Sequence, residues 1–352
     1  MINRGKYTFE SYAIVLNADR TILKLNLALE KLGYKFQWVD ATELETNFSE
    51  IFNVPKGNDR PLTIMIGREF KGISHELHNA LVHTPPFGEI IHMEFPGILL
   101  LRKLTDFDVA GDAMDFVIEQ TAFMTFFDFA NDLLLQMRLF KIGEIRYSQF
   151  FCITSETRQV GLRKTGISIG SRGDYTLTDE EAENLSNILV AKYETNNLTE
   201  LAIKNFNVVY DLPDGRLRFI TLITCLESLF NLGRDQIAHT ISRHLSIILS
   251  DNKEQFKENY KIIKKLYNMR SSIVHGGEYS GDIIKDYLHL SDKVRVAIKY
   301  CNVPNLTKEK LFEDLNSRGF NEHITNINPS GQRDHKLQVG RLRTDIGKPL
   351  QL

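Results

Sequence analysis

The last third of the chain shows an almost continuous helical pattern, which restricts the possible fold more than any other feature. Between residues 198 and 303, apolar side chains recur at the spacing of an amphipathic helix. Short breaks interrupt them at Pro213, at Gly233, and at Gly276 with Gly277, which are residues that stop helices. The pattern predicts helices over about 199–210, 214–231, 234–250, 254–275 and 279–302. We expect these helices to pack together as a bundle.

The N-terminal part of the chain alternates between short strand-like and helix-like segments. Four runs have strand character, at 11–17, 34–40, 61–67 and 88–95. Helical spacing appears between them, at 19–33 and at 73–84. Such alternation is typical of a small α/β domain, which we place at residues 1–145.

A long helix at about 111–140 and two strand-like runs at 147–154 and 160–170 connect the two regions. Thr178 and Glu181 then have the spacing of a capping box that opens a helix. We interpret the strands as a short lead-in to the helical bundle. The expected fold class is therefore α+β, mainly α, with a helical domain at 146–318 and a flexible basic tail at 319–352.

Composition indicates a cytoplasmic globular protein. The 352 residues include 42% hydrophobic residues, and the formal net charge of −2 does not exclude nucleic acid, because a local basic patch is sufficient. Cys152, Cys225 and Cys301 lie far apart, as expected for reduced thiols. The most apolar run, at 122–140, contains charged residues, and the N-terminus lacks the apolar core of a signal peptide. We therefore expect no membrane segment.

The predicted helix at 254–275 carries an arginine and a histidine on different sides. At about 100° per residue, an apolar stripe should face the bundle. It consists of Ile262, Leu266, Met269 and Ile273. Arg270 lies about 70° to one side of this stripe and His275 lies nearly opposite it, so the two are about 140° apart.

The outer face of this helix should hold further apolar side chains, from Tyr260, Ile263, Tyr267 and Val274. Such a face is rarely left in water. Two copies packed about a two-fold axis would cover it and bring Arg270 and His275 of both chains together. We therefore expect a homodimer through this helix.

Basic residues lie on the side of His275. Lys253, Lys257 and Lys264 form a row that could follow a phosphate backbone. The alternative interpretation is an ordinary solvated face with interspersed glutamates. His275 precedes Gly276, which we expect at the C′ position of the helix, and a helix C-terminus favours a positively charged histidine.

A carboxylate in an earlier helix also requires explanation. Glu227 falls in the predicted buried stripe of Ile220 and Ile223, and a buried carboxylate needs a partner. The candidate partners are Arg216, Arg243 and Arg270. His244, by contrast, lies in an apolar stripe of the next helix and is interpreted as a core histidine.

Three segments, RFITLITCLESLFN, ISRHLSIIL and KKLYNMRSSIVHGG, resemble the HEPN superfamily, specifically its ApeA-like domain, over about 199–303. Arg270 and His275 match the family's arginine and histidine near the end of a helix. Glu227 matches its acidic residue on an earlier helix. Ser271 departs from the family pattern, since many active members have Asn, Asp or His there.

The resemblance implies an antiparallel helical bundle. It also implies a metal-independent endoribonuclease, commonly a dimer with a composite site, that acts in phage defence or in a toxin system. RNA supplies its own nucleophile, the 2′-hydroxyl, so the protein needs only proton transfer and charge stabilisation. The expected catalytic residues are Arg270, His275 and Glu227, with no cofactor. The residues expected to bind RNA are Lys253, Lys257, Lys264, Tyr267 and Ser271.

Other sites have weaker support. His75, His78 and His83 lack the HExxH spacing of a zinc site, and we expect no metal. A non-catalytic HEPN module that binds RNA or a partner protein is the alternative function, and Ser271 leaves it open. In either case the N-terminal domain is a candidate sensor of a phage-derived or cellular trigger.

Overall fold

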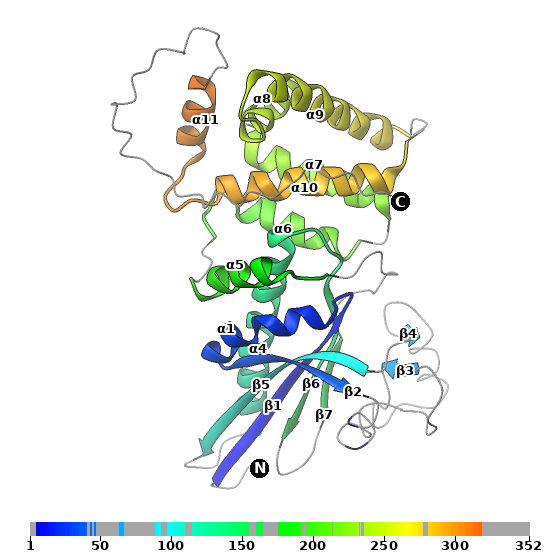
Figure 1. Ribbon diagram of the computed structural model, residues 1–352, viewed down its shortest axis with the longest axis vertical. Helices are drawn as coiled ribbons and strands as arrows, with labels where there is room; N and C mark the ends of the chain where they lie inside the picture. Colours follow the sequence, from blue (N-terminus) through cyan, green and yellow to red (C-terminus); the bar gives the residue numbers. More distant parts are fainter. Residues whose placement is uncertain are drawn as a thin grey trace.

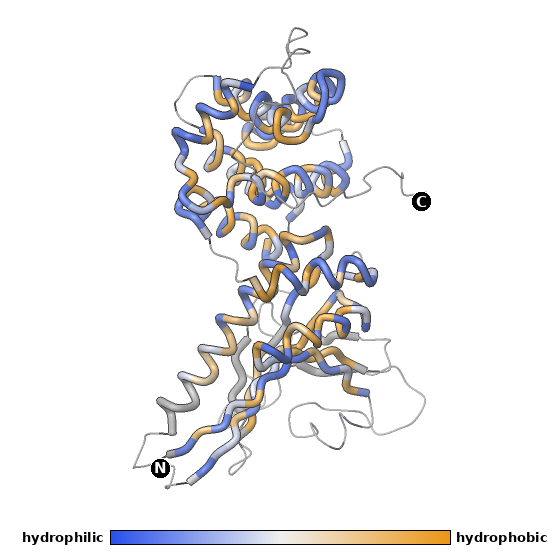
Figure 2. Tube along the Cα trace, turned by 60° about the vertical axis from the view of Figure 1, so that its left-hand side comes forward, coloured by the Kyte–Doolittle hydropathy of each residue, from blue (hydrophilic) through white to orange (hydrophobic). Residues whose placement is uncertain are grey.

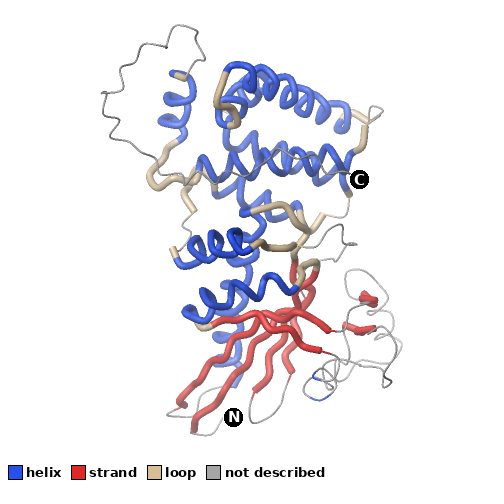
Figure 3. Tube along the Cα trace, viewed as in Figure 1, coloured by secondary structure: helices blue, strands red, loops and turns tan. Residues whose placement is uncertain are grey.

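Two regions of different secondary structure follow one another along the long axis of the protein (Figure 1). The computed structural model describes residues 5–40, 43, 46, 63–66, 89–92, 97–109, 115–154, 160–164, 175–191, 195–212, 214–231, 233, 236–276 and 281–318. An antiparallel sheet with its helices forms one end, and stacked helices form the other (Figure 3). The chain is therefore a mixed α+β protein with a helical C-terminal region.

The sheet has the strand order β2-β5-β1-β6-β7, and every neighbouring pair is antiparallel. The strands are β1 (Gly5–Leu16), β2 (Tyr34–Asp40), β5 (Gly97–Val109), β6 (Arg146–Thr154) and β7 (Val160–Lys164). A separate antiparallel hairpin joins β3 (Thr63–Ile66) to β4 (Glu89–His92). The four strands expected in the N-terminal part are confirmed, but they do not build an alternating α/β sheet.

The interior strand β5 was not expected from the sequence, although it pairs with both β1 and β2. Its first residues, Ile98–Leu101, are buried on both faces of the sheet and so show no alternation of polar and apolar side chains. β6 and β7 also differ from expectation. They pair through β1 into the same sheet, whereas the sequence placed them as a lead-in to the bundle.

Helices cover the sheet and connect it to the bundle. The segment expected as one helix at 19–33 is divided into η1 (Arg20–Leu25), α1 (Asn26–Leu29) and η2 (Glu30–Leu32), and Gly33 ends it with a φ of 81°. The long helix α4 (Asp115–Phe140) confirms the prediction and buries Phe126, Leu133 and Met137 against the sheet.

The bundle confirms the helical pattern of the C-terminal part. Its helices are α6 (Glu200–Val209), α7 (Gly215–Phe230), α8 (Ile237–Ile248), α9 (Lys253–Val274) and α10 (Ile283–Cys301). They follow α5 (Asp179–Val190), where Thr178 and Glu181 form the predicted capping box. α11 (Lys308–Ser317) was not predicted, and it packs Leu311 and Leu315 against the bundle core. Hydrophobic and hydrophilic stretches alternate along the bundle helices in Figure 2.

A buried carboxylate joins the sheet region to the bundle. Glu144, between α4 and β6, accepts hydrogen bonds from Arg146 of β6 at 2.9 Å, from Arg218 of α7 at 3.1 Å, and from the Tyr287 hydroxyl of α10 at 3.2 Å. Arg295 of α10 also donates to the carbonyl of Arg138 in α4 at 2.7 Å. Because these groups are largely buried, the two regions are fixed relative to each other.

Within the described ranges, no helix is long and apolar enough to cross a membrane. Cys152, Cys225 and Cys301 are all buried, and no disulfide joins them to one another, as expected. The candidate metal residues His75, His78 and His83, and the tail at 319–352, lie outside the described residues.

Candidate active site

The inward face of α9 is broader than the sequence indicated. Its two buried residues are Ile263, which is 1% exposed, and Leu266, which is 3% exposed. α7 and α8 both pack against α9, so apolar side chains are needed over a wide arc. On an ideal helix Arg270 lies within about 20° of Ile263, and it therefore points toward the bundle and not toward an outer face.

Arg270 is paired with the carboxylate of α7. Its Nε lies 3.5 Å from Oε1 of Glu227, and the side chains are 35% and 20% exposed, respectively. Of the three arginines considered for Glu227, the partner is therefore Arg270. Arg216 is exposed, and Arg243 donates instead to the carbonyls of Leu315 and Arg318 near the end of α11. The expectation that Glu227 has an arginine partner is confirmed, and the structure selects Arg270 among the three candidates.

Tyr267 completes this cluster. Its hydroxyl donates a 2.8 Å hydrogen bond to Oε1 of Glu227, the same oxygen that lies next to Arg270. Desolvation and, to a smaller extent, the Glu227 carboxylate together raise the pKa of Tyr267 to about 12, while Arg270 opposes the change. Tyr267 is therefore protonated at neutral pH and can donate its hydroxyl hydrogen to Glu227.

Tyr267 thus differs from its predicted role in binding RNA. Tyr267 packs against the bundle core and holds Glu227, so its hydroxyl is already engaged within the chain. Spacing alone could have placed Tyr267 next to Arg270, three residues later, but not its contact with α7.

The guanidinium of Arg270 is only partly satisfied. Its Nε is buried and forms no hydrogen bond within the described residues, since Glu227 approaches as an ion pair at 3.5 Å. No terminal nitrogen of Arg270 donates a hydrogen bond to any side chain or carbonyl in the described ranges. A partly exposed arginine in this condition can offer its planar fork to an anion such as a phosphate.

His275 lies on the opposite side of the helix. It is the C-cap of α9, with its backbone N–H donating to the carbonyl of Ser271 at 3.0 Å. The next residue, Gly276, has a φ of 72°, which confirms the predicted C′ glycine. The His275 side chain is exposed, and it stands about 140° around an ideal helix from Arg270. One chain therefore does not aim both groups from the same face.

The predicted apolar outer face is wrong in its main members. Ile263 is buried, Tyr267 packs inward, and the Tyr260 hydroxyl lies 2.9 Å from Nδ1 of His239 on α8. Val274 alone of the four proposed residues is exposed, at 50%. The apolar surface that favoured a homodimer is thus much smaller than expected, because α8 and α7 cover most of it.

The residues predicted to bind RNA differ in how far they are exposed. Lys257, Lys264 and Ser271 are exposed, while Lys253 is half-buried at the first residue of α9. The ammonium of Lys264 lies 5.8 Å from the centre of the Tyr260 ring.

His244 confirms its interpretation as a core histidine. It is 2% exposed, its Nε2 lies 3.0 Å from Oδ1 of Asn316, and burial lowers the pKa of its imidazole. Within the described ranges, no group of His, Cys, Asp and Glu is arranged to hold a metal ion.

Comparisons of the chain with family models, with curated proteins and with solved structures gave no match.

Proposed function

We propose that the helical region is a HEPN-type endoribonuclease that cleaves RNA without a metal ion. The observation that carries this proposal is the Glu227–Arg270 pair between α7 and α9, with His275 at the end of the same helix α9. An oriented arginine and an exposed histidine are the two groups that cleavage by the RNA 2′-hydroxyl requires.

Each residue has a distinct role in this proposal. Glu227 and Tyr267 orient Arg270, whose guanidinium stabilises the charge on the scissile phosphate. His275 removes the proton of the 2′-hydroxyl or protonates the leaving 5′-oxygen. The products are a 2′,3′-cyclic phosphate and a 5′-hydroxyl, and DNA is not a substrate because it lacks the nucleophile.

A composite site in a homodimer remains part of the proposal, although only one of the two sequence arguments for it is retained. Arg270 and His275 are about 140° apart on one helix, so a second copy is needed to place both kinds of group at one phosphate. In the cell, such a ribonuclease would serve in phage defence or as a toxin. The N-terminal sheet region would then respond to a phage-derived or cellular trigger.

A second candidate function is a non-catalytic module that binds RNA or a partner protein. The observation in its favour is the same divergence of Arg270 and His275, because a lone chain with this geometry can bind an anion at Arg270 without cleaving it.

Incubation of the purified protein with total RNA separates the two functions. Wild type should cleave RNA, whereas Arg270→Ala/His275→Ala should not. A matched control is Arg216→Ala/His289→Ala, which removes one exposed arginine and one exposed histidine from other bundle helices. RNA that stays intact with wild type but is retained in a binding assay would favour the non-catalytic module.

A further inference from the structure

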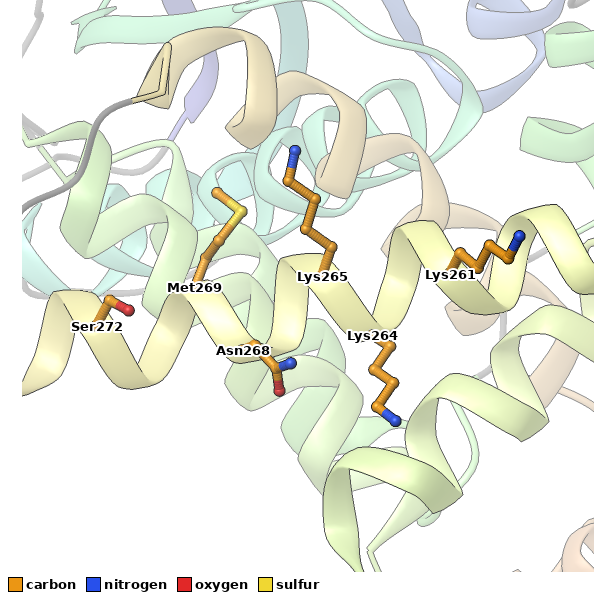
Figure 4. Close-up of a pocket in the computed structure, with 6 residues that line it drawn as sticks. All are labelled: Lys261, Lys264, Lys265, Asn268, Met269 and Ser272. Carbon is orange, nitrogen blue, oxygen red and sulfur yellow. The ribbon is translucent and has the colours of Figure 1, made fainter.

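The outward face of α9 carries a shallow groove. Two rows of side chains, each spaced by four residues, border an open hollow of about 450 Å³. One row is Lys261, Lys265 and Met269, and the other is Lys264, Asn268 and Ser272. Figure 4 shows Lys265 and Met269 on one side of the helix and Lys264 with Asn268 on the other. Residues four apart form such parallel ridges on any helix, and the groove lies between them.

The groove is positively charged and holds no acidic side chain. Lys261, Lys264 and Lys265 are exposed, and none forms an ion pair with another side chain in the described ranges. From residue 259 to residue 275 the sequence contains no Asp or Glu. Lys261 and Lys265, which follow Lys257 at intervals of four residues, repel one another along the helix. A bound anion would remove this repulsion.

The groove leads toward His275 and away from Arg270. Ser272, at the end of one row, precedes His275 by three residues, or somewhat less than one helical turn. On an ideal helix His275 lies within about 20° of both Lys264 and Asn268, so it continues the line of that row. Arg270 lies about 140° from this line.

We propose that this groove binds the phosphodiester backbone of a single-stranded RNA whose next phosphate reaches His275. The lysine ammonium groups would neutralise phosphates, while the Asn268 amide and the Ser272 hydroxyl donate hydrogen bonds to phosphate oxygens. An acidic protein helix is the less suitable occupant, because Met269 is the one apolar side chain in the lining and an interface core needs more. The inference rests on the proposed function in assigning the bound strand to His275.

This path differs from the row expected from the sequence. Lys264 belongs to both, but Lys261 and Lys265 replace Lys253 and Lys257. The difference arises because a linear series of lysines does not indicate which of them enclose a hollow.

The test uses oligonucleotides that the protein cannot cleave. A twelve-nucleotide 2′-O-methyl RNA and the same sequence as single-stranded DNA are titrated by fluorescence anisotropy at several salt concentrations. The variant is Lys261→Ala/Lys264→Ala/Lys265→Ala, and the control is Lys31→Ala/Lys285→Ala/Lys310→Ala, which removes three exposed lysines elsewhere. Circular dichroism and thermal melting check that both variants are folded.

We expect the groove variant to lose at least about tenfold in affinity. The slope of log K against log salt should flatten by about 2, since each single-strand phosphate contact contributes about 0.7. The control variant should match wild type. Equal affinity and equal slope for all three proteins would overturn the proposal, as would tighter binding of polyglutamate than of either oligonucleotide.

The design also separates this inference from the proposed function. Loss of binding in the groove variant would establish the groove even if wild type never cleaves RNA. In that case the proposed nuclease activity is refuted, and the proposal that the groove binds RNA still holds.

Discussion

The charged side chains on the inward and outward sides of α9 differ in whether they have partners within the chain. On the inward side, Arg270 lies next to Glu227, which also accepts the Tyr267 hydroxyl. On the outward side, Lys261, Lys264, Lys265 and His275 are exposed. On the inward side, the contact with Glu227 fixes the direction of the Arg270 side chain and restricts its motion. The unpaired side keeps its cations available for a ligand.

This difference predicts that the stability of the fold depends on the inward side of α9, whereas function depends on both sides. Substitutions on the outward side should affect activity and binding while leaving the fold intact. Substitutions on the inward side should affect both, because they remove a partner from a partly buried group.

The largest expected effect is on cleavage by the two proposed catalytic residues. His275→Ala and Arg270→Ala should each lower the rate of RNA cleavage by about 10² to 10⁴-fold, which is typical of losing a proton-transfer group or a phosphate ligand. The melting temperature should stay unchanged for His275→Ala and fall slightly for Arg270→Ala, which breaks a partly exposed ion pair. Wild-type cleavage by both variants would refute the site.

The next effect concerns Glu227. Glu227→Ala should lower the free energy of unfolding by about 1–3 kcal/mol, because it leaves the Tyr267 hydroxyl without its acceptor and removes the carboxylate that forms an ion pair with Arg270. Glu227→Gln keeps an oxygen for Tyr267 and should recover part of this loss, but not the cleavage activity. Urea denaturation measures the difference, with exposed Glu313→Ala as the control. A loss in the Glu313 variant as large as that in Glu227→Ala would contradict the pairing.

Tyr267→Phe should give a smaller effect that depends on pH. It removes one hydrogen bond, worth about 1 kcal/mol. Because burial raises the pKa of Tyr267 to about 12, its contribution should be complete below pH 10 and lost as the pH rises toward 12. The difference in unfolding free energy between wild type and Tyr267→Phe should therefore be present at pH 8 and diminished at pH 11.5. The same difference at both pH values would show that this hydroxyl does not titrate as described.

Removal of metal ions should have the smallest effect. Cleavage should continue in excess EDTA, because the nucleophile belongs to the RNA and the proposed charge stabilisation comes from Arg270. The products should end in 2′,3′-cyclic phosphate, which is detectable by mass spectrometry. A strict requirement for magnesium would exclude this chemistry.

The parts of the fold that follow from local rules could be predicted from the sequence. The helical period of apolar residues predicted α6 to α10. The spacing of three residues between Thr178 and Glu181 predicted the capping box at the start of α5. The pairing of Glu227 with an arginine also followed, because a carboxylate in an apolar stripe needs a partner.

The parts that depend on contacts between distant segments could not be predicted in the same way. β5 lies between two strands, and its uniformly apolar start does not distinguish a central strand from other buried segments. Ile263 was placed outside because the width of the inward face depends on how many helices surround α9. The role of Tyr267 required the position of α7, which no spacing within α9 provides.

The Glu144 junction has a consequence for any attempt to separate the two regions. A fragment beginning at Tyr147 would retain Arg218 and Tyr287 but lose the carboxylate that both of them contact. It would also leave β6 without its neighbour β1. Arg218 and Glu227 are on the same helix α7. Loss of the Arg218 contact at one end of α7 would therefore also disturb the position of Glu227 near its other end. A truncated protein that lost activity would therefore report a broken fold, not a missing sensor, and point substitutions within the intact chain are the sound way to test regulation.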